Sequence, residues 1–189
     1  MSSTAEELIV RHRLTVADFH RMGEAGILHE DSRVELIEGE IIDMAPIGSL
    51  HAGTVRQLSR LLERAVGDLA LVSAQNPFIL DDHSEPEPDI ALLRPRADFY
   101  KSAHPRPKDV LLAIEVAESS LRYDQKVKAP LYARHGIPEL WVVDVENSRL
   151  IIYRRPENGI YQDVVTPSAI TSVAPALLPV AILNLSGLF

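Results

Sequence analysis

The sequence predicts a mixed α/β domain in which helices pack on a central β-sheet. Residues 110–117 read VLLAIEVA, an apolar run without polar alternation, which is typical of a strand buried on both faces. Residues 49–66 carry Val55, Leu58 and Leu62 at helical spacing, which predicts a helix with one apolar face. Strand and helix patterns that alternate along one chain favour a layered architecture of sheet and helices.

The chain is long enough for one domain with a substantial hydrophobic core. It has 189 residues, of which 46% are apolar and 24% are charged, close to an average globular protein. We therefore expect a single domain over residues 1–189, with residues 1–13 as a flexible arm. The first residues lack the basic and apolar segments of a signal peptide, and no apolar run reaches about 18 residues. We expect a cytoplasmic protein that does not enter a membrane.

Cap and turn residues set the expected elements of the first half. Thr15, followed by an acid three residues later, predicts the start of a helix that ends near Gly26. Two short apolar runs flank Glu38-Gly39 and predict a β-hairpin. Ser49 is expected to cap the long helix. Further strands are expected at 69–74, 77–80 and 89–93, with loops at 81–88 and 94–108.

The second half is expected to add one helix and a second hairpin. The helix is predicted over 124–135 and ends at Gly136, while Pro130 should cause a kink or a late start. The proline-containing tail is expected to wrap the edge of the sheet. The remaining strands are expected at 140–145, 149–154 and 161–165.

The composition limits the classes of function. A net charge of −8 counts against a general nucleic-acid coating protein, although it does not exclude a nuclease whose cations are local. The absence of cysteine excludes disulfides, thiolate zinc sites and cysteine nucleophiles. The histidines form neither an HExxH motif nor a zinc-finger spacing, and the GxSxG, Walker A and GxGxxG motifs are absent.

Glu115 is the main anomaly, because it lies inside the most apolar strand. Burial of a lone carboxylate costs on the order of several kcal/mol, so this side chain requires a cation, a proton or a partner. Strand alternation places it on one face with Leu111, Ala113 and Ala117, and the small alanines would leave room beside it. Its alternative role is a buried salt bridge to Lys128 or to an arginine.

Asp89 and Lys128 complete a candidate divalent-metal site. Asp89 opens a strand, and if that strand neighbours Glu115 the two carboxylates could share one Mg²⁺. Lys128 shares a helical face with Asp124 and Tyr132. Its ammonium could offset the charge that develops during phosphodiester hydrolysis. Taken singly, Asp89 could be a strand or turn cap, and Lys128 a solvated helix residue.

The order of these residues resembles the PD-(D/E)XK signature of nucleases: Pro88-Asp89, then Glu115 26 positions later, then a lysine. Longer stretches cover nearly the whole chain from Leu14. They are LTVADFHRM (14–22), RVELIEGEIIDMAPIGSLH (33–51), QNPFILDDHSEPEPDIALLRPR (75–96), VLLAIEVAESSLRYDQKVKAPLYARHGIPELWVVDVENSRLIIYR (110–154) and LNLSGLF (183–189). In these stretches the chain resembles the Uma-two family of restriction-endonuclease-like proteins within that superfamily.

The resemblance implies a restriction-endonuclease-like fold, an α/β domain with a mixed β-sheet flanked by helices. It also implies that Asp89 and Glu115 bind Mg²⁺, for which Mn²⁺ can substitute. The superfamily lysine normally stands two residues after the acid, where this chain has Ala117. Lys128 on the following helix is the expected substitute, because Lys126 lies about 200° of helical rotation away. The matching stretches place four further residues around the site: Glu35, His51, Gln75 and Asp124.

Several other polar residues have two interpretations. His51 could act as a general base or cap a helix, and we favour a supporting role beside the site. Glu85 and Glu87 are expected in a solvated acidic loop. The basic residues of the second loop could contact phosphates or simply face solvent: Arg94, Arg96, Lys101, Arg106 and Lys108.

The leading hypothesis is a Mg²⁺-dependent DNA endonuclease that acts as a homodimer, without an identifiable protein partner. The apolar hairpin residues Trp141 and 151–153 could form the dimer interface or belong to the core. The negative charge and Ala117 motivate an alternative, a non-catalytic oligomeric binding or regulatory module with the same fold. A third hypothesis is a phosphoesterase of small molecules.

Overall fold

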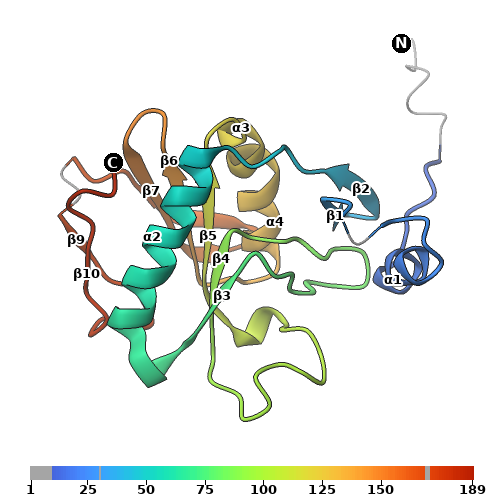
Figure 1. Ribbon diagram of the computed structural model, residues 1–189, viewed down its shortest axis with the longest axis horizontal. Helices are drawn as coiled ribbons and strands as arrows, with labels where there is room; N and C mark the ends of the chain where they lie inside the picture. The colour runs from blue at the N-terminus through green and yellow to red at the C-terminus, as the bar shows by residue number, and fades with distance from the viewer. Residues whose placement is uncertain (1–9, 30, 169–170) are drawn as a thin grey trace.

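The centre of the fold is a six-stranded mixed sheet with the strand order β3-β4-β5-β6-β7-β8 (Figure 1). The structure is a computed structural model that describes residues 10–29, 31–168 and 171–189. β5 and β6 are parallel and the other neighbours are antiparallel, which confirms the predicted mixed sheet. The strands are β3 (Leu71–Ala74), β4 (Ile90–Leu93), β5 (Val110–Ala117), β6 (Glu139–Asp144), β7 (Arg149–Glu157) and β8 (Ile160–Val165).

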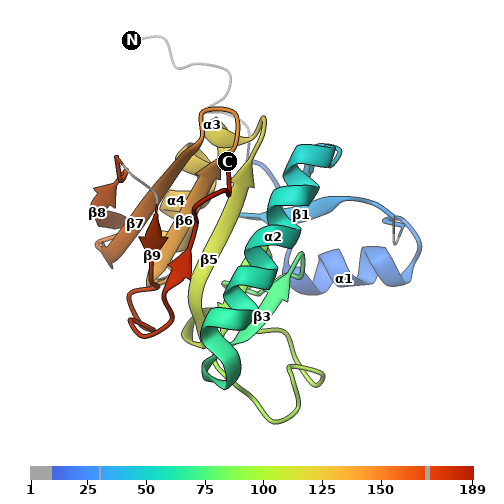
Figure 2. The same ribbon diagram turned by 60° about the vertical axis from the view of Figure 1, so that its left-hand side comes forward.

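Helices lie on both faces of this sheet, as Figure 2 shows for the long helix α2 on one side and α3 and α4 on the other. Leu58 and Leu62 of α2 pack on apolar residues of β4, β5 and β6, and Leu131 and Tyr132 of α4 pack on the opposite face. No helix among the described residues is both long and apolar enough to span a membrane. The helices and helical turns are α1 (Val16–Glu24), α2 (Ser49–Val66), η2 (Gly67–Leu69), η3 (Pro107–Asp109), α3 (Leu121–Tyr123), the π-helical turn η4 (Asp124–Lys128) and α4 (Ala129–Arg134).

The C-terminal segment covers part of the α2 face, and the prediction that it wraps the sheet edge is wrong. It forms the small antiparallel pair β9 (Ser172–Val173) and β10 (Leu183–Asn184). Ala181, Leu183 and Leu185 are buried in the same core as α2, because alternate apolar residues of the tail turn inward.

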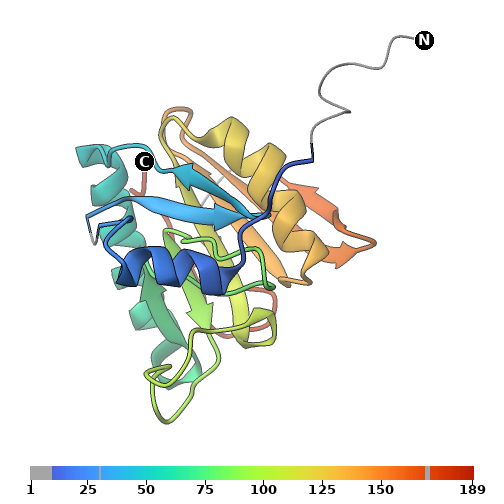
Figure 3. The ribbon, with the colours of Figure 1, turned by 90° about the vertical axis from the view of Figure 1, so that its right-hand side faces the viewer.

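A separate hairpin of β1 (Val34–Ile37) and β2 (Glu40–Asp43) lies beside α1, outside the main sheet (Figure 3). The turn residues Glu38 and Gly39 have φ angles of 50° and 82°. Two consecutive positive φ angles match the right-handed twist of the strands, so the predicted two-residue hairpin is confirmed. The predicted capping box of α1 is also present, with Thr15 and Asp18 bonded reciprocally.

The strand β5 contains a bulge that changes which residues share its faces. Leu92 pairs with Leu112, whereas Leu93 pairs with Val110, so Leu111 has no opposite residue. Leu111 consequently packs in the α2 core, and its predicted place beside Glu115 is wrong. Ala113 and Ala117 do face α4 together with Glu115, because the alternation is regular beyond the bulge.

Residues 78–80 are buried, but the segment 77–80 is not a strand, so that prediction is wrong. Phe78 and Leu80 donate backbone hydrogen bonds to the carbonyls of Pro86 and Ser84. Pro86 has no N–H group to return such a bond, and a regular ladder cannot form. The chain between β3 and β4 is instead a compact loop packed against α4.

Helix boundaries differ from the prediction at two places. Gly48 precedes α2 as the N-cap, without a side-chain cap, in place of Ser49. The second helical segment begins at Leu121 rather than at residue 124, and it accommodates Pro130 by a π-helical turn. The predicted end is confirmed, since Gly136 follows with a φ angle of 72°.

The hairpin β6–β7 forms as predicted, but its apolar residues belong to the core. Trp141, Ile151 and Ile152 are all buried. Trp141, Ile151 and Ile152 therefore have the core role that the sequence left open, whereas Tyr153 is only partly buried. The expected arm at 1–13 is described only for 10–13, which are exposed; residues 1–9 lie outside the described residues.

Candidate active site

Asp89 and Glu115 come from neighbouring antiparallel strands. Ile90 pairs with Ile114, so the residue before β4 lies beside the residue that follows Ile114 on β5. Asp89 and Glu115 are only 8% and 3% exposed, and both line the same cavity. The sheet register therefore brings together the two acids that the sequence singles out.

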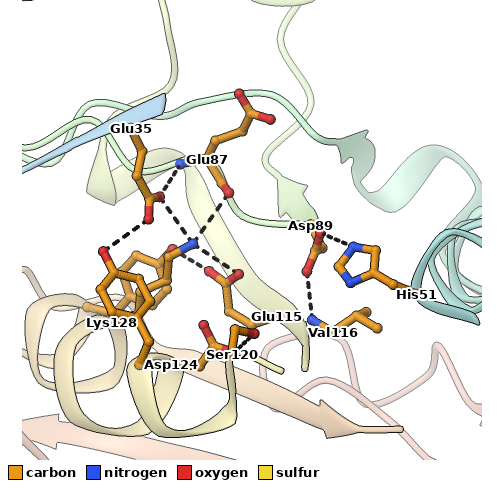
Figure 4. A network of polar contacts seen from close by, with 11 residues as sticks. Glu35, His51, Glu87, Asp89, Glu115, Val116, Ser120, Asp124 and Lys128 are labelled. Atoms are coloured by element: carbon orange, nitrogen blue, oxygen red, sulfur yellow. Dashed lines mark hydrogen bonds and ion pairs between the residues drawn. The ribbon is translucent and has the colours of Figure 1, made fainter. Parts of the chain in front are cut away.

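The Asp89 carboxylate is fixed by two partners (Figure 4). One oxygen accepts a hydrogen bond from the backbone N–H of Val116 at 2.7 Å, and the other lies 2.8 Å from Nε2 of His51. His51 lies in the first turn of α2, which places it near the N-terminal end of β4, where Asp89 lies. The hydrogen bond to Asp89 raises the pKa of His51 although burial opposes this.

The Glu115 carboxylate is held from α4 and η4. Its Oε2 lies 3.2 Å from Nζ of Lys128, and its Oε1 accepts a hydrogen bond from the Tyr132 hydroxyl at 2.7 Å. Burial raises the pKa of Glu115, and the ammonium of Lys128 partly offsets this. The salt bridge considered for Glu115 is therefore present, and its partner is Lys128.

Lys128 is itself buried and shared between two acids. Its Nζ also lies 3.1 Å from Oε2 of Glu35, a buried residue of β1. Although burial opposes the charge, the carboxylates of Glu115 and Glu35 raise the pKa of Lys128 and keep it protonated. Glu35 in turn accepts hydrogen bonds from the Tyr123 hydroxyl at 3.1 Å and from the Glu87 backbone at 3.2 Å.

The π-helical turn η4 presents Asp124 and Lys128 to the same cavity. The N–H of Ala129 bonds to the carbonyl of Asp124, five residues back, which widens the helix by one residue before Pro130. The Asp124 carboxylate accepts a hydrogen bond from Ser120 at 2.7 Å. Burial raises the pKa of Asp124 to about 6.

These side chains line a cavity of about 270 Å³ whose wall is strongly acidic. The basic residues that line the cavity are fewer: Arg33, Lys128 and His51. A surplus of carboxylates around a small cavity favours a divalent cation with a preference for oxygen ligands. The acidic residues that line it are Glu35, Asp43, Glu87, Asp89, Glu115, Glu118 and Asp124.

Asp89 and Glu115 are the candidate ligands for such a cation. Within the described part of the chain, the structure brings no three carboxylate or imidazole ligand atoms of this cavity to within 4.8 Å of one another. Mg²⁺ is commonly held by one or two carboxylates and keeps several waters, for which the cavity has room. Asp89 and Glu115 thus fit as the protein ligands of such an ion.

The family model described as "Putative restriction endonuclease" (Uma2) matches residues 16–186. The chain belongs to the Uma2 family. A crystal structure described as a putative nuclease belonging to DUF820, from Anabaena variabilis ATCC 29413, is similar with a TM-score of 0.71 and 20% identity. The similarity covers 93% of this chain and 97% of that one, and at this identity it shows a common fold. The search among curated proteins gives no match.

In this Uma2 protein the structure separates the residues that the sequence grouped around the site. Glu35, His51 and Asp124 line the cavity. Gln75 does not: it lies in a turn with a φ angle of 52°, and its side chain is exposed. Only its backbone reaches the site, where its N–H donates to the Asp89 carbonyl at 3.0 Å. Lys126 is exposed, as its helical angle indicates.

The acidic loop of this Uma2 protein is not solvated as expected. Glu85 is 4% exposed, and Glu87 is half-buried and lines the cavity. Burial raises the pKa of Glu87. The prolines on either side of Glu87 favour an extended backbone, and Glu85 pairs with Leu36 of β1. The burial follows from this long-range pairing, which the local sequence does not indicate.

Tyr132 and Tyr123 are site residues that we did not predict from the sequence. Each donates its hydroxyl to one of the buried carboxylates, and the position of Tyr132 four residues after Lys128 is the signal that could have identified it. The basic residues of the loop 94–108 do not line the cavity. Arg96 instead pairs with Asp98 and stacks on Tyr100.

Proposed function

We propose that this chain is a Mg²⁺-dependent nuclease that hydrolyses phosphodiester bonds in DNA, and that Mn²⁺ can replace Mg²⁺. Asp89 and Glu115 would hold the ion. The observation that supports this is one small acidic cavity that contains both buried carboxylates and a buried lysine. A bound Mg²⁺ would lower the pKa of a water and polarise the phosphate.

Lys128 supplies a fixed positive charge at the cavity wall. It stays protonated between Glu115 and Glu35, so it can stabilise the negative charge that develops on a phosphate oxygen in the transition state. The residue two positions after Glu115 is Ala117. Lys128 instead reaches Glu115 from η4, with its Nζ 3.2 Å from Oε2, and this supports a lysine that has moved to the helix.

His51, Tyr132 and the backbone of Val116 position the two carboxylates. The hydrogen bonds to Asp89 leave little freedom for its side chain, and the Tyr132 hydroxyl does the same for Glu115. Carboxylates that are oriented before the ion binds lose less side-chain freedom on binding.

The direct test is cleavage of plasmid and single-stranded DNA with Mg²⁺ or Mn²⁺. We expect the wild type to cut and Asp89→Ala to lose activity by at least about 100-fold, because one ligand of the ion is removed. Glu63→Ala, at an exposed acid of α2, is the matched control and should cut normally. Equal cleavage by wild type and Asp89→Ala would reject the assigned site.

A non-catalytic binding module with the same fold is the second candidate. It is favoured by the net charge of −8, which repels DNA, and by the absence of a lysine at position 117. Titration calorimetry separates the two. Heat of Mg²⁺ binding that disappears in Asp89→Ala supports the nuclease, whereas no Mg²⁺ or Mn²⁺ heat supports the binding module. Hydrolysis of nitrophenyl phosphodiesters without DNA cleavage would instead identify a phosphoesterase.

The homodimer remains a prediction from the chemistry, because cutting both strands of a duplex usually requires two active sites. Sedimentation velocity checks it directly. A species of twice the chain mass of 21.0 kDa is the expected result, and a monomer at all concentrations would contradict it.

A further inference from the structure

Two histidines and a glutamate meet outside the acidic cavity. His20 belongs to α1, Glu85 to the loop before β4, and His104 to the loop before β5. One ligand atom from each lies within 4.8 Å of the other two. In the part of the chain that the structure describes, this is the one group of three such ligands that meets this limit. We propose that these residues form a second metal site, with a preference for Zn²⁺.

Glu85 is the fixed ligand of this site. It is 4% exposed, and its Oε2 lies 2.7 Å from Nε2 of His20. Its backbone exchanges hydrogen bonds with Leu36 at 2.7 and 3.3 Å, which holds the residue against β1. A carboxylate buried at this depth is stabilised by positive charge beside it, which a bound cation supplies.

Backbone hydrogen bonds join the segments that carry these histidines, four residues before His20 and one residue after His104. The N–H of Val16 donates to the carbonyl of Asp82 at 2.7 Å and ties α1 to the loop that carries Glu85. The N–H of Ile79 donates to the carbonyl of Pro105 at 3.0 Å, one residue beyond His104. The imidazole rings of His20 and His104 have their centroids 5.9 Å apart. The three segments are therefore held together before any ion binds.

The ligand chemistry distinguishes this site from the acidic cavity. Two imidazole nitrogens and one carboxylate oxygen suit Zn²⁺, whereas Mg²⁺ prefers oxygen ligands and water. Tetrahedral Zn²⁺ with bonds near 2.1 Å separates its ligand atoms by about 3.4 Å. Nε2 of His20 and Oε2 of Glu85, now 2.7 Å apart, would separate to that spacing, and His104 would approach them. Both histidines are exposed, so these movements involve side chains at the surface.

Three protein ligands would leave one coordination position of the ion to water.

The site also has a structural consequence, because Glu85 pairs with Leu36 and lies two residues before Glu87. An ion here would brace α1 and both loops against β1, next to Glu35 and Glu87 of the acidic cavity. The site is independent of the proposed nuclease activity and can be tested without it.

The test uses the full chain, stripped of metal by a chelator, with Zn²⁺ titrated by calorimetry and Co²⁺ absorption as a second readout. We expect His104→Ala to bind one equivalent of Zn²⁺ fewer than the wild type and to lose the tetrahedral Co²⁺ absorption. His29→Ala, which removes an exposed histidine just after α1, should match the wild type.

If His20 and Glu85 form only a hydrogen bond and no metal site, the opposite result is expected for His104→Ala. In that case His104→Ala would bind Zn²⁺ with the wild-type stoichiometry and affinity, and the proposal would be overturned. His104 is exposed, so this variant should keep the fold, which circular dichroism without metal verifies. Asp89→Asn should keep the tetrahedral Co²⁺ absorption that His104→Ala loses, because Asp89 belongs to the other site. Loss of this absorption in Asp89→Asn but not in His104→Ala would assign the binding to the acidic cavity and reject the second site.

Discussion

Lys128 places one ammonium between two buried carboxylates, at 3.2 Å from Glu115 and 3.1 Å from Glu35. Removing one partner of a buried ion pair leaves uncompensated charge, which costs about 3 kcal/mol or more. We therefore expect Lys128→Ala to lower the free energy of unfolding by about that amount. Urea denaturation in metal-free buffer measures it.

Lys126→Ala is the matched control for this prediction, because the same residue type is lost from the same helical turn but from an exposed position. Its effect should stay within about 0.5 kcal/mol. Equal urea midpoints for Lys128→Ala and Lys126→Ala would show that the buried lysine does not stabilise the acids as described.

For individual residues, the sequence predicts only what the pattern of neighbouring residues can indicate. Glu115 could be identified because all its neighbours along the strand are apolar, and Lys128 because helical spacing aligns it with Asp124. The contact of Lys128 with Glu35 could not be predicted, because it depends on how a separate hairpin packs on a helix. Gln75 was misplaced because a positive φ angle turns its side chain away from the site.

The β1–β2 hairpin depends on Gly39 for two separate reasons. Its φ angle is 82°, and a Cβ added there would lie 2.6 Å from the Cβ of Arg13 and 2.9 Å from its Cα. Gly39→Ala should therefore suffer both left-handed strain of about 1 kcal/mol and displacement of the 10–14 segment. The loss of thermal stability should exceed the strain alone.

Gly26→Ala isolates the strain, because its φ angle is 71° and a Cβ there would meet nothing within 4 Å. We expect a clearly larger decrease of Tm for Gly39→Ala than for Gly26→Ala. Identical decreases of Tm for the two variants, measured by calorimetry, would show that the segment before α1 does not clash with a side chain at position 39.

The turn of the β6–β7 hairpin is stabilised by Asp144 in a pH-dependent way. Although burial opposes ionisation, hydrogen bonds from Arg149 and Asn147 hold the pKa of Asp144 below its usual value. A lowered pKa contributes stability above the unfolded value near about 3.9, and the contribution is lost as the pH falls through the folded pKa.

Asp144→Asn should therefore be less stable than the wild type at pH 7, and the difference should shrink as the pH falls below about 4. Urea midpoints from pH 7 to pH 2.5 measure this. A difference that stays constant over the whole range would mean that ionisation of Asp144 does not stabilise the turn.

Elements with strong local signals were predictable, and elements that depend on distant partners were not. The capping box of α1 and the turn at Glu38-Gly39 are local, and both predictions are confirmed. The π-helical turn before Pro130 and the loop at 77–80 depend on packing against other segments. A proline in the sequence shows that a regular pattern must be interrupted, but it does not show how.

The whole molecule places its acidic cavity where the layers meet. The β1–β2 hairpin, α2 and the α3–η4 segment each contribute side chains around the ends of β4 and β5. No single segment contains the site, so only the assembled fold can show that Asp89 and Glu115 share a cavity. The same is true of His20, Glu85 and His104, whose meeting no sequence spacing indicates.

The proposed Mg²⁺ site predicts that Mg²⁺ stabilises the folded chain as a whole, because the acidic cavity exists only in the folded state. At a concentration 100-fold above its Kd, a ligand adds about 2.7 kcal/mol to the free energy of unfolding. We expect Mg²⁺ to raise the Tm of the wild type but not of Asp89→Asn. Sodium chloride at matched ionic strength is the control, and an equal increase with sodium would mean that only general screening occurs.

The central claim is that Asp89 and Glu115 together hold a divalent cation. Anomalous diffraction from a crystal soaked in Mn²⁺ tests it most directly, because the ion and its ligands are located in one map. We expect a peak within about 2.0–2.4 Å of a carboxylate oxygen of each residue. Clear density for both side chains with no Mn²⁺ peak between them would contradict it.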